Sequence, residues 1–94
     1  MTMLDQIAGK IIKEQELIIG PLAWEEAGKV NGLRVIDKRA GSVAIESSDN
    51  RSVIDNLVKI YELFFGRASR EVCREAAAPF LASLTPAEIP LSLQ

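Results

Sequence analysis

Three arginines in the C-terminal third have the spacing that most directly suggests a chemistry. Arg67, Arg70 and Arg74 follow Gly66 and open a predicted helix. Arginines placed in this way contact DNA phosphates in helix-turn-helix proteins, whose turn often contains glycine. Acidic residues alternate with these arginines, and a face of alternating charge is typical of a solvent-exposed helix. The pattern therefore favours an ordinary amphipathic helix, and DNA binding stays as an alternative.

The side chains that could perform catalysis are few. The chain has one cysteine, Cys73, and no histidine. Cys73 falls within the apolar stripe of a predicted helix, where no base would activate its thiol, so we expect it to be buried and inert. The neighbouring carboxylates Glu25 and Glu26 point to different faces of a helix and cannot act as an acid pair. Together with the lack of nucleotide-binding and metal-binding motifs, this predicts a protein that is not an enzyme and has no cofactor.

Three aromatic residues on separate predicted helices could line a ligand pocket. These are Trp24, Tyr61 and Phe80. Aromatic side chains at helical spacing are more often part of the core than of a pocket, so packing is the preferred interpretation. A sensor that binds a small apolar or anionic molecule near Trp24 remains an alternative function.

Positive charges gather where the chain changes direction between two predicted strands. Lys38 and Arg39 lie in this connection, and Arg34 precedes it. Cations at a loop tip usually serve only solubility. Contact with an anion or an acidic partner is the alternative that this cluster raises.

The elements that must position these residues follow from periodicity and from start and stop signals. Two short strands joined through residues 37–42 predict a β-hairpin. The fold class is therefore α+β in the order ααββαα, with about four helices packed on a two-stranded antiparallel hairpin. The helices are expected over residues 3–19, about 21–30, from 53 (or slightly earlier, from a cap at Asp49 or Asn50) to 65, and about 70–84, with a kink or a break at Pro79.

Apolar residues on the third helix exceed what one buried face requires, and this surplus predicts an interface. That helix is apolar nearly all round, so we expect it to be the most buried helix or to face a partner. Residues 85–94 are too apolar for an idle tail and are expected to dock in a groove of this chain or of a partner. The candidate interface residues are Ile60, Leu63, Phe64, Ile89, Leu91 and Leu93.

Composition bounds the remaining possibilities. Ninety-four residues, of which 48% are hydrophobic, predict one small domain over residues 1–94. The net charge of −2 is spread without a basic stripe, which argues against nucleic acid, and no stretch predicts a membrane helix. A single cysteine suits the cytoplasm. The favoured function is a non-catalytic interaction or regulatory module that forms a homodimer.

Overall fold

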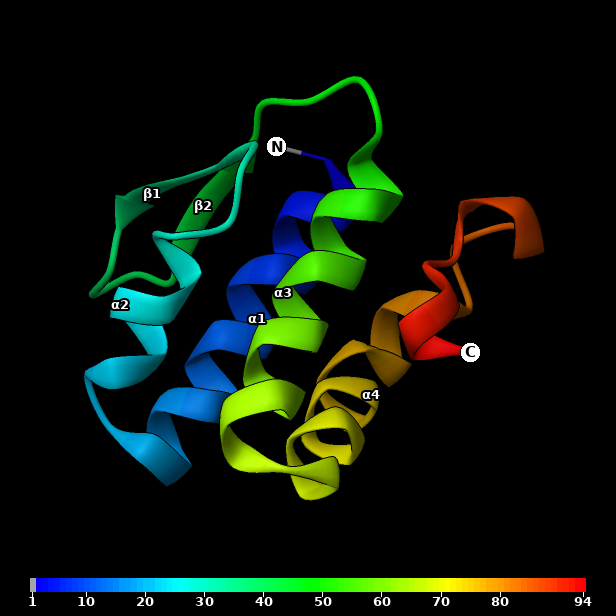
Figure 1. Ribbon diagram of the computed structural model, residues 1–94. Helices are drawn as coiled ribbons and strands as arrows, with labels where there is room; N and C mark the ends of the chain where they lie inside the picture. Colours follow the sequence, from blue (N-terminus) through cyan, green and yellow to red (C-terminus); the bar gives the residue numbers. More distant parts are fainter. Residues whose placement is uncertain (1) are drawn as a thin grey trace.

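The computed structural model describes residues 2–94 and confirms the α+β class and the predicted element order (Figure 1). Two short 3-10 segments, η1 and η2, follow the last helix. None of the helices in the described part of the chain has the length and apolar character needed to cross a bilayer. The elements are α1 (Met3–Ile19), α2 (Leu22–Ala27), β1 (Leu33–Asp37), β2 (Ser42–Ile45), α3 (Asn50–Phe65), α4 (Arg67–Leu81), η1 (Pro86–Glu88) and η2 (Leu91–Leu93).

Helix α1 is the central element of the fold. Its N-terminus is closed by a capping box in which the Thr2 hydroxyl accepts from the Asp5 amide and the Asp5 carboxylate accepts from the Thr2 amide. The helix packs against α2, β2, α3 and α4. Eight of its residues are buried, compared with five in α3, so the prediction that α3 would be the most buried helix is wrong. Helix α1 is covered by the hairpin as well as by the other three helices, which accounts for the difference.

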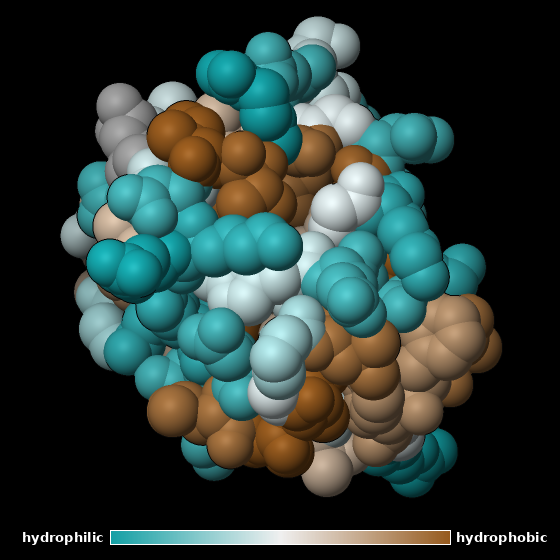
Figure 2. All heavy atoms as spheres, turned by 90° about the vertical axis from the view of Figure 1, so that its left-hand side faces the viewer, coloured by the Kyte–Doolittle hydropathy of each residue, from teal (hydrophilic) through white to brown (hydrophobic). Residues whose placement is uncertain are grey.

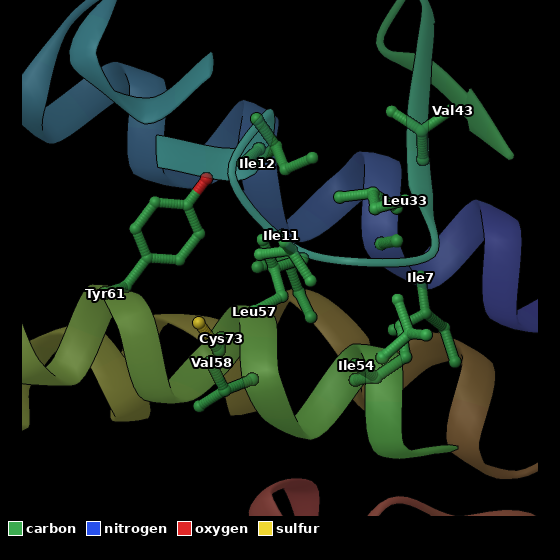
Figure 3. Close-up of a cluster of buried hydrophobic side chains, with 14 of the residues drawn as sticks. Ile7, Ile11, Ile12, Leu33, Val43, Ile54, Leu57, Val58, Tyr61 and Cys73 are labelled. Atoms are coloured by element: carbon green, nitrogen blue, oxygen red, sulfur yellow. The ribbon is translucent and has the colours of Figure 1, made fainter. Parts of the chain in front are cut away.

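The core lies between the hairpin and α1 on one side and α3 with α4 on the other. Isoleucines of α1 point toward apolar side chains of α3, and the hairpin closes the top of this layer (Figure 3). The Tyr61 hydroxyl donates to the Ala23 carbonyl at 2.7 Å, which joins α3 to α2. Among the largest fully buried side chains are Ile7, Ile11, Ile12, Val43, Ile54, Leu57 and Tyr61.

The β-hairpin is antiparallel and contains one irregularity. Val35 pairs with Val43, and the next pair along is Asp37 with Ser42, so Ile36 has no partner and forms a bulge. This explains why Ile36 interrupts the apolar alternation of β1 and is exposed. The Asp5 carboxylate also accepts from the Ile45 amide at 2.9 Å, which fastens β2 to the start of α1.

The boundaries of the helices differ from the prediction where capping residues compete. Asp49 caps α3 by accepting from the Ser52 amide, so the earlier of the two predicted starts is correct. Helix α2 is shorter than predicted and ends at Ala27. Helix α4 begins directly after Gly66, whose positive φ of 87° reverses the chain in one residue, and so starts earlier than the predicted residue 70.

The C-terminal part has two further features, the end of α4 near Pro79 and the position of the tail. Helix α4 continues through Pro79 to Leu81 as one helix, so the predicted break at Pro79 does not occur. The proline removes one backbone hydrogen bond, but only two helical residues follow it. After it, η2 packs on α3 and α4, and Leu93 is buried. The Asp55 carboxylate accepts from both the amide and the hydroxyl of Ser92, at 3.0 and 2.6 Å. The tail therefore docks on its own chain.

Candidate functional site

Exposed apolar side chains gather at the end of the molecule where α1 and α3 finish. We call this group the apolar pole. Its exposed fractions range from 38% to 80%, which is high for large aliphatic and aromatic side chains. The members are Leu17 (80%), Ile18 (62%), Leu22 (38%), Leu63 (74%) and Phe64 (60%).

The backbone brings these residues to one end. Helices α1 and α3 run in the same direction and end together at the bottom of Figure 1, beside the starts of α2 and α4. Two buried hydrogen bonds tie the four elements here. Tyr61 on α3 donates to Ala23 on α2, and the Gln15 amide on α1 donates to the Ser69 carbonyl on α4 at 2.9 Å. Figure 2 shows hydrophobic side chains along the lower end of the face formed by the left side of Figure 1.

The pole residues are exposed because both helices extend past the layer that buries them. Within the last turn of each helix, Ile19 and Phe65 still pack on the core, while their neighbours in sequence point away from it. Gly20 and Gly66, both at positive φ, then turn the chain before it could fold back over them. The last turn of neither helix carries a basic residue. No cation on α1 or α3 therefore offsets the partial negative charge that the helix dipole places at its C-terminal end.

The structure separates the predicted interface residues into two groups. Ile60 and Leu63 line a groove of about 300 Å³ together with Val30, and Phe64 lies at the same end of α3. In the tail, Ile89 and Leu91 line a different hollow beside Asp55. Asp55 belongs to the first half of α3, so the tail lies away from the pole, on the right side of Figure 1. Leu93 is buried by its own chain.

The three aromatic residues of the predicted ligand pocket occupy different environments. Tyr61 is fully buried, and burial raises the pKa of its hydroxyl, which is already bonded to the Ala23 carbonyl. Trp24 is 3% exposed, and its indole N–H donates to the Glu16 carboxylate at 2.9 Å. Phe80 is partly buried on α4. Trp24 lines a hollow to which neither Tyr61 nor Phe80 contributes.

Two of the three arginines of the DNA-binding alternative lie close to acidic groups. Arg70 lies 3.9 Å from the Glu62 carboxylate, and Arg74 lies 3.2 Å from that of Glu71. The link between α3 and α4 is Gly66 alone, whereas a helix-turn-helix has a turn of about three or four residues. This geometry gives the DNA-binding alternative no support.

Cys73 lies in the core between α4 and α1. The Gln15 amide donates to its Sγ at 3.4 Å, and burial raises the pKa of the thiol to about 11. A thiol with a raised pKa is a poor nucleophile at neutral pH. Within the described part of the chain, no group of three or more His, Cys, Asp or Glu side chains could hold a metal ion.

No protein-family model, curated protein or solved structure matches the chain.

Proposed function

We propose that this protein is a non-catalytic interaction module that self-associates through the apolar pole. The observation that carries the proposal is the joint exposure of Leu17 and Ile18 at the end of α1 and of Leu63 and Phe64 at the end of α3. Large apolar side chains that are exposed together at one end of a small domain are typical of an interaction site. Its burial against a second copy would remove apolar area from water.

A dimer of standard size would need only a small part of the molecular surface. A standard interface covers about 800 Å² on each partner, which is about one seventh of the 5380 Å² surface of this chain. The pole supplies the apolar centre, and the charged residues around it supply a polar rim. In a two-fold dimer the same patch meets itself, so one exposed surface is sufficient.

The polar groups at this end also suit a second copy of the chain. Arg67 opens α4 beside the pole and has no ion-pair partner among residues 2–94. The C-terminal ends of α1 and α3 at the same pole carry the partial negative charge of the helix dipole. Arg67 of one copy can therefore approach these ends in the other copy, which makes the surface self-complementary in charge.

Light scattering coupled to size-exclusion chromatography tests the proposal. The wild-type chain should approach twice its mass of 10.3 kDa as the protein concentration rises. Leu63→Glu should return it to the single-chain mass, because two copies of the pole would then bury unpaired carboxylates. A wild-type chain that stays at the single-chain mass up to about 1 mM, a concentration above any useful dissociation constant, would refute the proposal.

Leu91→Glu is the matched control. Leu91 is exposed to the same fraction as Leu63, 74%, but belongs to the docked tail. This variant should keep the wild-type mass, and circular dichroism should show that both variants keep the helical content. If Leu91→Glu dissociates the dimer and Leu63→Glu does not, the interface lies on the tail and not at the pole.

A further inference from the structure

We propose that the hollow between α1, α2 and the hairpin turn binds a small oxyanion that carries two or more negative charges. The hollow has a volume of about 400 Å³, within the usual range of about 300–1,000 Å³ for small-molecule sites. Three of its lining residues are cations from two separate parts of the chain. The lining consists of Lys13, Glu16, Pro21, Trp24, Lys38 and Arg39.

Hydrogen bonds within the hairpin turn fix its backbone without a ligand. The Asp37 carboxylate accepts from the amides of Arg39 and Ala40, at 3.0 and 3.3 Å, and the Gly41 amide donates to the Lys38 carbonyl at 3.2 Å. These bonds hold the backbone under the Lys38 and Arg39 side chains. Binding would therefore order two side chains and not a loop, which lowers its entropic cost.

Close packing of glycines places this turn against α1. A Cβ atom at Gly9 would collide with the Gly41 carbonyl, so only glycine allows the turn to approach α1 this closely. The aliphatic stem of Lys13 lies directly against Gly41, where an added Cβ atom would be only 2.9 Å from the Lys13 Cγ. The turn thus brings Lys38 and Arg39 to the side of α1 that carries Lys13.

The charge in the hollow is positive although the chain is negative. Lys13, Lys38 and Arg39 contribute three positive charges and Glu16 one negative charge, which leaves two positive charges. Glu16 is already occupied, since one oxygen accepts from the Trp24 indole and the other lies 3.6 Å from the Lys13 ammonium group. Neither Lys38 nor Arg39 forms an ion pair with any residue the structure describes.

These features select the class of ligand. Cations from two elements around one hollow favour a compact dianion or trianion over a single carboxylate. Pro21 and the edge of Trp24 give the hollow one apolar wall, against which the carbon part of a phosphate ester or a polycarboxylate can rest. Figure 2 shows the face that contains the hairpin and α2, with hydrophilic side chains across its middle between two hydrophobic areas. None of the residues that line the hollow belongs to the apolar pole, and a single copy of the chain supplies all of them.

Isothermal titration calorimetry with pyrophosphate and with citrate, at low and constant ionic strength, tests the proposal on the wild-type chain. We expect saturable binding of one anion per chain. Saturation by both anions would assign a general oxyanion site, and saturation by pyrophosphate alone would assign a phosphate site. The absence of saturable heat up to about 10 mM, where only negligible affinity would remain, overturns the proposal.

Charge variants locate the binding. The pair Lys38→Gln and Arg39→Gln should together weaken binding by about tenfold or more, since two cations near the ligand are lost. Glu16→Gln should strengthen binding severalfold, because the amide oxygen still accepts from the Trp24 indole while the repulsive charge is gone. Lys59→Gln removes another exposed cation, one outside the hollow, and should leave binding unchanged. Equal losses in the Lys59 variant and the double variant would show non-specific attraction and contradict the site.

Nuclear magnetic resonance gives an independent signal. Trp24 is the only tryptophan and is bonded to Glu16 within the hollow. Titration of the wild-type chain should place the largest anion-induced shifts on the Trp24 indole N–H and on residues 38–41, and the double variant should lose these shifts. Shifts that centre on residues 67–74 instead would move the anion to the arginines of α4 and refute the assignment.

Discussion

Helices α1 and α3 each have two parts, and apolar residues have opposite environments in them. In the first part of α3, Leu57 is fully buried between the helices, while six residues later Leu63 is 74% exposed. In α1, Ile11 and Ile12 are buried, and Leu17 and Ile18 are exposed. The side chains are alike in chemistry, so the difference comes from what covers them. An apolar stripe shows that a helix needs a neighbour but not how far along its length the neighbour extends.

The C-terminal tail shows the same contrast over two residues. Leu93 is buried on α3 and α4, whereas Leu91 is exposed. The tail covers one side of α3 near Asp55, and no part of the described chain covers the ends of α1 and α3. The protein's own tail therefore covers some of the surplus apolar residues of α3. Leu63 and Phe64 stay exposed and belong to the apolar pole.

The largest effect is expected from truncating the same residue type in the two parts of α3. Leu57→Ala should lower the free energy of unfolding by about 3 kcal/mol, since it leaves a cavity in the core. Leu63→Ala should change it by no more than about 0.5 kcal/mol when the protein is diluted until light scattering gives the single-chain mass. Urea denaturation followed by circular dichroism measures both. Similar losses in the two variants would mean that Leu63 is covered within the monomer.

A smaller effect is expected where the backbone of α1 meets the hairpin. Gly9→Ala should destabilise the protein by about 2 kcal/mol, because the added methyl group must push the Gly41 carbonyl away and this exceeds the gain in helix propensity. Gly28→Ala is the matched control, since the atoms nearest to an added Cβ there are 3.5 Å or more away and its φ is negative. That control should be neutral or slightly stabilising in thermal denaturation. A neutral Gly9→Ala would show that the turn docks loosely.

The smallest effect on folding is expected at the pole itself. Leu17→Lys places a cation in the last turn of α1, where no basic residue lies, and should stabilise the monomer by about 0.3–0.5 kcal/mol through the helix dipole, as thermal denaturation would measure. The same charge should weaken self-association, so stability and dimer mass should change in opposite directions. Leu17→Gln separates the two, because it removes the apolar surface without adding charge. A destabilising Leu17→Lys would place Leu17 in the core.

Local signals are sufficient to predict α1 and the hairpin. The period of apolar residues predicts α1 over its full length, and the alternation around residues 37–42 predicts the hairpin. The start of α3 is ambiguous in the sequence because Asp49 and Ser52 are both good capping residues and only the folded backbone chooses between them. The Thr2–Asp5 capping box is a local pattern too, but the apolar period alone does not reveal it.

The α+β class, the order of elements and the excess of apolar residues on α3 follow from the sequence alone, because they depend on spacing along one helix or strand. Which residues remain exposed depends on the packed fold, since Leu63, Leu91 and Leu93 differ only in what packs over them. The fold also brings Lys13 to Lys38 and Arg39, through the contact of Gly9 with Gly41. Contacts between residues far apart in the chain leave no periodic trace in one sequence, and burial depends on such contacts.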